Sequence, residues 1–394
     1  MKQRFFYISN AFEDSLKNLR SINGDSPAVS AKVIRICQAV KEQGENAIII
    51  SLGRKRQTNS WKWYPAIIRR AGNVPLVYAT FFDAPILTHL ISTCSLFLII
   101  NRLSNKKSVL IFYNYLLYYI PTLIINKILG RRCLLDLEDG IRRDDKTLRS
   151  RVNFISFKIH NLFCNNGATV ASEALIMQTT IRPTMVCYGV APMIYTQKDW
   201  SVFPLHILYG GALLKDTGAE LFLDALDILF LKGKNISTKI KFIVTGFGDM
   251  SEQIKQITQN KFSSIVDFRG SVSTSEYFEI LEKCQIGLAL KIPTMSMGMT
   301  TFPSKVIEMA AFGLLIVSTR VSDVPKVFSD STAVLLSETS PIMLADVIND
   351  ILTAPLQYRE LAIRGQNRIR TSLSPERIGK DMIEFWRGIK VSDN

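Results

Sequence analysis

The sequence has 394 residues, of which 47% are hydrophobic and 21% charged, and its formal net charge is +14. That length exceeds one ordinary hydrophobic core and predicts two domains. The composition excludes a disordered or low-complexity chain.

The positive charge is confined to the first half of the chain. Residues 1–195 hold 26 Lys and Arg against 12 Asp and Glu, whereas residues 196–394 hold 22 of each. Because only one half is basic, we expect it to meet a polyanionic partner, either anionic lipid headgroups or nucleic acid. A basic surface without any partner is the alternative.

The N-terminus and the cysteines favour a cytoplasmic protein. Only four apolar residues precede Ser9, and Glu13 and Asp14 follow closely, so no secretion signal is predicted. The six cysteines are scattered, with no C-x-x-C pair and no histidine at metal-ligand spacing. We expect them to be reduced thiols in the core.

Short β-type runs alternate with helical patterns in the first half. Ser26-Pro27 is expected to begin a helix whose apolar residues keep a 3.6-residue period as far as Gly44. This alternation predicts a doubly wound parallel sheet. The predicted strands are Arg4–Ile8, Ala47–Ser51, Pro75–Thr80, Ser108–Phe112 and Cys133–Leu137.

Two segments of the first half allow more than one interpretation. Val109–Leu129 has the length of a membrane span, but polar residues and a proline interrupt it, so strand, turn and buried helix are favoured. Trp61–Arg70 mixes aromatic and basic residues. That mixture suits a lipid headgroup interface, and a partly buried strand or loop explains it equally well.

The second half repeats the alternation of strands and helices, after a linker predicted at Ala191–Pro204. A helix is predicted from Gly218 to about Leu231, and Ser374-Pro375-Glu376 is expected to cap a last helix with one apolar face. We therefore predict domains at 1–195 and 196–375, with a C-terminal helix at 376–394. The predicted strands are His206–Tyr209, Phe242–Thr245, Ile265–Phe268, Ile286–Leu290, Leu314–Ser318 and Ala333–Leu336.

The segment Phe302–Thr319 has the features of a phosphate-binding turn and helix. Ser304 is expected to cap a short helix whose free N–H groups favour a phosphate, and Lys305 adds a cation beside it. Glu308 lies one turn further on, where its carboxylate can accept hydrogen bonds from a diol. Gly313 is expected to end the helix.

This segment resembles the donor site of retaining GT-B glycosyltransferases, the large nucleotide-sugar-dependent family that includes bacterial lipopolysaccharide, capsule and exopolysaccharide transferases. The family pattern of proline, small residue, lysine, aliphatic residue and glutamate, followed by alanine, glycine and an aliphatic strand, is filled from Pro303 to Val317. The resemblance implies a GT-B fold, in which two Rossmann-like domains face each other across a cleft and the last helix crosses back towards the N-terminal domain. It also implies that Glu308 binds the donor ribose and that the helix start with Lys305 holds the diphosphate.

Three further segments resemble the same family in order and spacing. They are Tyr209–Ala212 with Gly218, the strand and Gly-x-Gly turn Phe242–Asp249, and Val266–Val272. Glycines there would let the backbone approach phosphates closely. The predicted donor-binding residues are Gly210, Gly211, Lys215, Gly246, Gly270, Ser304, Lys305 and Glu308.

The sequence departs from the family pattern at three positions. Thr300 stands where many members have a first glutamate, and Ala212 and Thr217 stand where many have Arg and Lys. Lys215 and Lys305 are expected to supply that charge instead. The alternative is a degenerate site, in a non-catalytic accessory or sugar-nucleotide-binding protein.

In the N-terminal domain, acidic residues follow the predicted strand at Cys133–Leu137. Family members often have a polar or acidic residue there, near the acceptor hydroxyl, and a carboxylate could polarise that hydroxyl. We select Asp139 as catalytic, with Glu138 second, whereas a solvated loop end is the alternative. No pair of aspartates typical of a metal-dependent glycosyltransferase is present, so no metal and no cofactor are required.

These features predict an enzyme that transfers a sugar with retention from a UDP- or GDP-sugar to a surface-glycan acceptor, which a lipid could carry. The basic N-terminal domain would hold the enzyme peripherally on the inner face of the cytoplasmic membrane. Nucleic acid is a less favoured partner, because only the positive charge supports it.

Overall fold

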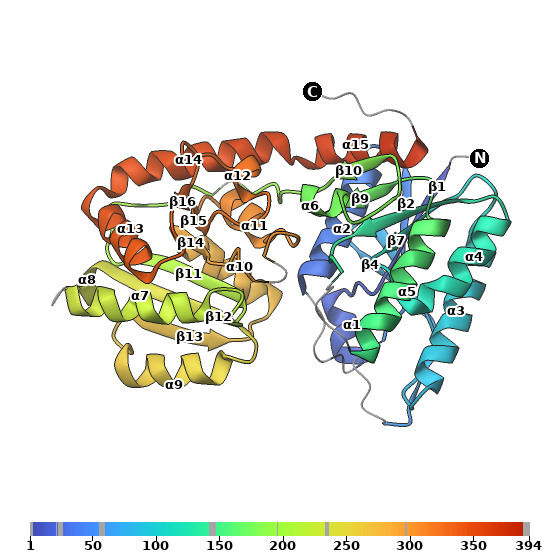
Figure 1. Ribbon diagram of the computed structural model, residues 1–394, viewed down its shortest axis with the longest axis horizontal. Coiled ribbons are helices and arrows are strands. Elements are labelled where there is room, and N and C mark those ends of the chain that lie inside the picture. The colour runs from blue at the N-terminus through green and yellow to red at the C-terminus, as the bar shows by residue number, and fades with distance from the viewer. Residues whose placement is uncertain are drawn as a thin grey trace. The chain divides into compact units, whose positions relative to one another are not determined.

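The computed structural model describes residues 3–20, 22, 27–54, 60–141, 147–194, 196–232, 236–295 and 298–388 (Figure 1). The chain forms two compact units. The first comprises Met1–Val190 and Leu373–Asn394, and the second comprises Ala191–Ser372.

The first unit is built on an eight-stranded sheet that is parallel except at one edge, where β4 pairs antiparallel with β5. The parallel strands have the buried, apolar sequences that a sheet covered on both faces requires. In sheet order the strands are β10 (Thr184–Val186), β9 (Ala168–Val170), β8 (Arg132–Leu137), β7 (Val109–Tyr113), β1 (Arg4–Ser9), β2 (Asn46–Ser51), β5 (Val74–Tyr78) and β4 (Ile67–Ala71).

Helices cover both faces of this sheet, and the side chains of β1 alternate between them. Phe6 and Ile8 pack with Leu96, Leu123 and Phe157, so α3 (Leu87–Leu103), α4 (Ile120–Ile128) and α5 (Leu148–Phe163) cover one face. The shorter helices of this unit are α1 (Asp14–Leu19), η1 (Leu117–Tyr119) and α6 (Glu173–Ile176).

The other face of β1 is covered by the C-terminal helix of the chain. Phe5 and Tyr7 contact Trp386 of α15 (Pro375–Arg387), with ring centroids 5.3 and 6.0 Å apart. Beside them α15 packs closely on α2 (Pro27–Glu42), because a Cβ on Gly379 would lie 2.5 Å from the Ala39 carbonyl oxygen. The Ser374 side chain caps α15 by accepting the Arg377 N–H at 3.2 Å, as the Ser-Pro-Glu pattern predicts.

The second unit has a six-stranded sheet in which every pair is parallel. In sheet order the strands are β13 (Val266–Gly270), β12 (Ile240–Phe247), β11 (Leu205–Ala212), β14 (Ile286–Ala289), β15 (Leu315–Thr319) and β16 (Val334–Leu336). The helices are α7 (Ala219–Lys232), α8 (Ile236–Lys239), α9 (Ser251–Lys261), α10 (Thr274–Lys283), α11 (Lys305–Ala311), α12 (Val324–Val327), α13 (Pro341–Thr353) and α14 (Pro355–Ser372).

Both sheets reverse their strand order next to their first strand. In the first unit the chain runs outward from β1 through β2 to β5 and then returns to β7, and in the second it runs from β11 to β13 and returns to β14. Ligands of doubly wound sheets bind at such switch points, outside the carboxyl ends of the strands. The carboxyl ends of β1, β7 and β8, and those of β11 and β14, are therefore where sites are sought in each unit.

The two ambiguous segments have defined structures. Val109–Leu129 forms β7, η1 and α4, so strand and turn are confirmed, but α4 is not a fully buried helix because Ile125 and Ile128 are exposed. Within the described parts of the chain, none of the helices combines the length and the apolar composition that crossing a bilayer requires. In Trp61–Arg70, Trp63 and Tyr64 form β3, which pairs antiparallel with β6 (Phe81–Phe82).

Two details differ from the sequence predictions, and one lies outside the described residues. Cys94 is exposed on α3, whereas the other five cysteines are buried thiols as predicted. Ser304 makes no capping hydrogen bond, because its own backbone is already helical, with φ −52° and ψ −23°. Pro27 begins α2 as predicted, but the proposed cap Ser26 falls outside the described ranges.

Candidate functional site

Glycines bring the loop after β11 against the end of β14. Gly218 has φ +86°, and a Cβ on it would lie 2.1 Å from the Leu290 carbonyl oxygen, so only glycine allows this approach. Gly211 also has positive φ, at +111°, but the nearest atoms to a Cβ there would be Lys305 Cδ and Nζ at 3.7 Å. Gly211 therefore needs glycine for its backbone angle rather than for lack of space.

The Gly-x-Gly turn after β12 packs directly on the same loop. A Cβ on Gly246 would lie 1.8 Å from the Gly211 carbonyl oxygen, and one on Gly248 would lie 2.4 Å from that of Leu213. The Leu213 N–H donates to the Phe247 carbonyl at 2.8 Å. These two glycines are thus needed for the packing of one loop on the other.

Lys305, the first residue of α11, lies beneath this glycine loop. Its ammonium donates to the Gly210 carbonyl at 2.5 Å and lies 5.6 Å from the centre of the Tyr209 ring. Burial, and then the positive charge of Lys291, lower the pKa of Lys305 to about 8. Among the described residues no carboxylate forms an ion pair with Lys305. The charge of this half-buried cation is therefore stabilised by the Gly210 carbonyl and the Tyr209 ring and not by a counter-ion.

The helix that carries Lys305 is short and sharply ended. Glu308 lies in its first turn and is half-buried. Gly313, with φ +82°, ends it as predicted: its N–H donates to Ala310, and the next N–H, of Leu314, donates to Met309. The structure therefore places Lys305 and Glu308 on one turn of α11, with Lys305 reaching Gly210.

The residues at the departures from the family pattern have structural partners. The Thr217 hydroxyl donates to the Ala212 carbonyl at 2.6 Å and accepts the Leu214 N–H at 3.0 Å, which closes the loop. Lys215 is exposed and forms an ion pair with Glu220 at 2.9 Å, and this partner raises the pKa of Lys215. That Lys215 and Lys305 supply the charge of the missing clamp residues stays a prediction.

At the end of β13, Gly270 adopts φ +62°, and a Cβ there would meet only Phe268 Cε1 at 3.7 Å. Beside it Arg269 pairs with Asp267 at 2.8 Å on the surface. The turn at Gly270 therefore has open space beside it.

A cavity of about 400 Å³ lies elsewhere in the second unit. Residues 196–198, Trp200, Gly313 and residues of α14 line it. It contains none of the predicted donor-binding residues and is no part of this site.

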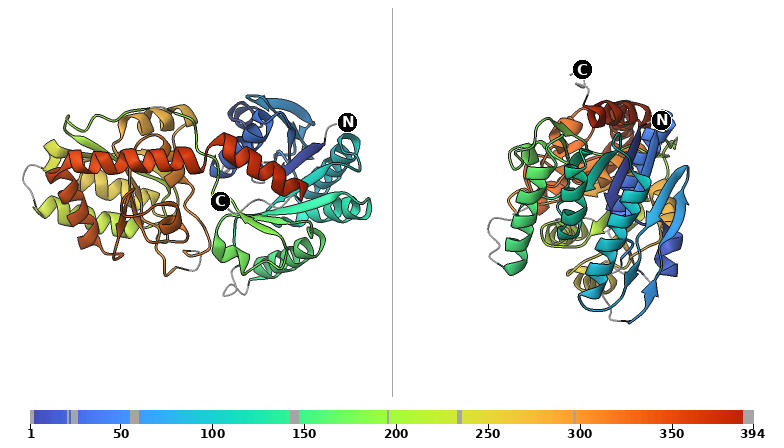
Figure 2. Two further views of the ribbon diagram at one scale, coloured as in Figure 1. Left: turned by 90° about the horizontal axis from the view of Figure 1, so that it is seen from above. Right: turned by 90° about the vertical axis from the view of Figure 1, so that its right-hand side faces the viewer.

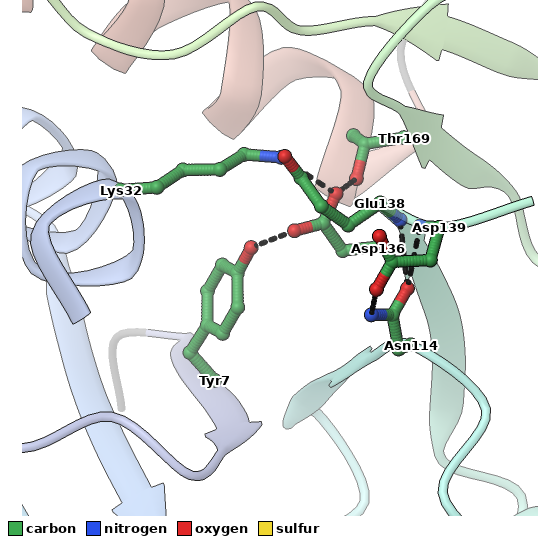
Figure 3. A network of polar contacts seen from close by, with 7 residues as sticks. All are labelled: Tyr7, Lys32, Asn114, Asp136, Glu138, Asp139 and Thr169. Carbon is green, nitrogen blue, oxygen red and sulfur yellow. Dashed lines mark hydrogen bonds and ion pairs between the residues drawn. The ribbon is translucent and has the colours of Figure 1, made fainter. Parts of the chain in front are cut away.

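In the first unit a buried polar network gathers at the carboxyl end of β8 (Figure 3). Asp136, which is 1% exposed, accepts hydrogen bonds from the Tyr7 hydroxyl and from the Thr169 hydroxyl, the latter at 2.8 Å. The Lys32 ammonium lies 3.5 Å from Asp136 and bonds directly to Glu138. Burial raises the pKa of Tyr7 and of Glu138, and the two carboxylates raise that of Lys32 despite its burial.

Glu138 and Asp139 have different surroundings, although they are neighbours. Glu138 is bound by the buried Lys32, whereas Asp139 is exposed and accepts the Asn114 side-chain N–H at 3.0 Å. The Asn114 side-chain oxygen accepts the backbone N–H groups of both acids, at 2.8 and 3.2 Å, and Asn114 itself has φ +56°. Asn114 thus holds the turn, and Asp139 is the carboxylate that a solvent-borne hydroxyl can reach.

Several residues of this network were not singled out from the sequence. Two signals could have indicated them. Lys32 stands on the apolar face of α2, four residues before Ile36, and Asp136 interrupts an apolar strand, so each needs a buried partner. The unpredicted members are Tyr7, Lys32, Asn114, Asp136 and Thr169.

Two doubly wound sheets, the second with glycine-rich strand ends, are typical of the GT-B fold. Across the described ranges no three His, Cys, Asp or Glu residues gather as a metal site would require.

Comparison with known proteins agrees with this class. Residues 204–354 match the model of the family "Glycosyl transferases group 1". Curated protein sequences contain no match to the chain.

Solved structures resemble the chain over almost its whole length. Sucrose-phosphate synthase from Thermosynechococcus elongatus superposes with a TM-score of 0.71 at 13% identity, covering 98% of each chain. TarM gives a TM-score of 0.69 at 11% identity, with 97% of this chain and 98% of TarM covered. HepE from Anabaena, solved with UDP, gives 0.64 at 14% identity, with 97% and 98% covered. These likenesses show that the chain has the GT-B fold, and residues 204–354, within the second unit, match the group 1 glycosyl transferase family.

Proposed function

We propose that the protein transfers a sugar from a UDP- or GDP-sugar to a growing surface glycan carried on a lipid, with retention of the anomeric configuration. The observation that carries the proposal is Lys305, a half-buried cation that no carboxylate of the described chain neutralises, at the switch point of the second sheet. A diphosphate is the ligand that such a cation, set beside an open glycine loop, would stabilise best.

The roles of the donor residues follow from their positions. Lys305 and the backbone around Gly211 would bind the diphosphate, since Gly211 leaves room beside the lysine. Glu308, one turn away, would accept hydrogen bonds from the ribose hydroxyls. Thr217 fills a position of the usual cationic clamp with a loop-closing hydroxyl, so Lys305 would carry most of the charge stabilisation as the nucleoside diphosphate leaves.

The acceptor role belongs to the first unit. For retention, the acceptor oxygen would bond to the anomeric carbon on the same face from which the diphosphate oxygen leaves, as the bond to that oxygen breaks. Asp139 would take up the proton of the acceptor hydroxyl. Among relatives in fold, HepE was solved with UDP and glucose, and a TarM variant with UDP and α-GlcNAc-glycerol. These ligands support a nucleotide sugar as donor and a hydroxyl-bearing sugar derivative as acceptor.

The proposal is tested first by nucleotide binding. A thermal-shift series with UDP, GDP and their sugars should give stabilisation by one nucleotide family, since a ligand of the native state stabilises it by mass action. Glu308→Ala should reduce that shift and abolish donor turnover, whereas Glu338→Ala, which removes an exposed carboxylate from the same unit, should change neither. A protein that folds but binds no nucleotide diphosphate would overturn the proposal.

The stereochemistry is tested separately on the product. Proton NMR of the newly formed linkage should show the anomeric configuration of the donor sugar. The opposite configuration would refute retention while leaving glycosyl transfer intact.

A further inference from the structure

Three helices of the first unit bury polar residues where apolar ones are expected. α3, α4 and α5 lie side by side over one face of the sheet (Figure 1 and Figure 2). A helix that covers a sheet in water normally turns its apolar stripe inward and its polar side outward. The buried positions here include Thr88 and Ser92 in α3, Thr122 and Asn126 in α4, and Ser156 and His160 in α5.

Many large apolar side chains of these helices are exposed, although Leu96, Ile100, Leu123 and Phe157 are buried. In α3, Leu87, Leu90 and Leu98 lie at intervals of three and eight residues, which places them on one stripe. Exposed apolar side chains that gather on neighbouring helices mark an interaction site. The exposed set comprises Leu87, Leu90, Leu98, Ile125, Ile128, Leu148, Phe154, Ile155 and Leu162, with exposed fractions from 36% to 77%. We call it, with the basic residues described next, the outer helical face.

The charges on this face are of one sign. The sequences of α3, α4 and α5 contain no Asp or Glu. Their exposed charged residues are all basic, and two lysines follow the end of α3. The exposed basic residues are Arg102, Lys106, Lys107, Arg149, Arg151 and Lys158.

The exposed apolar side chains and the basic residues together indicate which kind of partner this face binds. A second copy meeting this face symmetrically would bring cations against cations. Nucleic acid would use the basic residues, but it gains nothing from exposed leucine and isoleucine, since single strands stack on aromatic rings. A bilayer with anionic headgroups uses both, because apolar side chains enter the acyl boundary while Lys and Arg stay among the headgroups.

We infer that the outer helical face docks the protein on an anionic lipid bilayer, with α3, α4 and α5 lying in the plane of the headgroups. The outer helical face does not include Trp61–Arg70, the segment whose sequence first suggests a headgroup interface, although β3 of that segment pairs with β6, which contacts α3. The benefit for a lipid-linked acceptor rests on the proposed function, whereas the docking itself does not.

The inference is tested by sedimenting the full-length protein with vesicles, in the absence of donor and acceptor. Wild type should bind phosphatidylcholine vesicles that contain phosphatidylglycerol and should bind pure phosphatidylcholine much more weakly. Leu98→Gln/Ile128→Gln should weaken binding about ten-fold by removing two apolar contacts. Arg149→Gln/Arg151→Gln should weaken it about five-fold for each charge.

Three comparisons make the result decisive. Leu231→Gln/Leu356→Gln, which changes two exposed leucines of the second unit, should bind like wild type. The inference is wrong if the outer-face variants also bind like wild type, if Trp61→Ala/Trp63→Ala alone abolishes binding, or if wild type prefers a single-stranded oligonucleotide to anionic vesicles. UDP thermal shifts on the same variants should stay unchanged, which separates a failure of docking from a failure of the donor site.

Discussion

Replacing Lys305 by methionine should stabilise the protein without ligand and weaken its binding of nucleotide. The pKa of Lys305 falls from 10.5 to about 8, because burial and Lys291 disfavour the charged form. At about 1.36 kcal/mol per pH unit, this corresponds to about 3 kcal/mol by which the charged lysine destabilises the native state at pH 7. Loss of the hydrogen bond to Gly210 offsets about 1 kcal/mol of the gain, which leaves a net stabilisation of about 2 kcal/mol.

The sign of the pH dependence follows from the same values. Between pH 8 and 10.5 the unfolded chain keeps the Lys305 proton and the native state does not, so the free energy of unfolding rises with pH in wild type. Lys305→Met lacks this rise, so the two proteins should become equally stable about 1.5 pH units above pH 8, and wild type should be about 1 kcal/mol the more stable at pH 10.5. UDP binding has the opposite trend, because a bound diphosphate needs the ammonium: its affinity should fall about ten-fold per pH unit above pH 8.

Urea unfolding at pH 7 and 9, with calorimetric titration of UDP, measures both effects. Lys305→Met should lose 10- to about 150-fold in UDP affinity, the range for a hydrogen bond to a charged group. Lys215→Met, at the exposed lysine paired with Glu220, is the control and should unfold as wild type does. If Lys305→Met is less stable than wild type at pH 7, or binds UDP equally well, the assignment of Lys305 as an unneutralised phosphate ligand is refuted.

Three further predictions concern other parts of the two units. Lys32→Met should lower the free energy of unfolding by about 3–5 kcal/mol, because it leaves Asp136 and Glu138 buried without their cation. Because the pKa of Glu138 is raised, Glu138 takes up a proton more readily at low pH, so denaturation curves should show a smaller loss at pH 5 than at pH 8. Gly246→Ala should cost more than about 3 kcal/mol, whereas Gly44→Ala, with φ +79° and open space, should cost about 1 kcal/mol, and equal losses would contradict the loop packing. Asp139→Asn should lower kcat with little change in the unfolding midpoint; a large fall in stability with unchanged kcat would assign the acid to the fold instead.

Most strands could be predicted from the sequence because they are parallel and buried, but the three-residue strands β9 and β10 were not predicted. Each predicted run, such as Cys133–Leu137, overlaps an observed strand such as β8 within two residues at most positions, since apolar runs between turn signals leave little choice. The last helix could be predicted equally well, because its cap at Ser374 and its apolar stripe are both visible in the sequence. Antiparallel β4 carries the exposed sequence Ile67–Ala71 and gives no such signal.

Side-chain partners could not be predicted, because they depend on which strand ends are neighbours. The sequence places Lys305 at the start of a helix but does not reveal that it reaches Gly210, 95 residues earlier in the chain. It presents Glu138 and Asp139 as equivalent acids, and only the approach of Lys32 from α2 distinguishes them. The burial of Thr88 and Ser92 is likewise invisible locally, since α3 is apolar on most sides.

The two units handle buried charge in opposite ways, and the difference agrees with the separate roles proposed for them. In the first unit, Lys32 neutralises Asp136 and Glu138 inside the protein, so the network is complete without a ligand and holds the turn that exposes Asp139. In the second unit, the partners of Lys305 among the described residues are the Gly210 carbonyl and the Tyr209 ring. A buried cation without a counter-ion destabilises the native state. When an anion binds beside it, that destabilisation is removed, and the free energy regained strengthens the binding of the anion. The donor side is therefore built to change its protonation and stability with ligand, whereas the acid of the first unit is held ready beforehand.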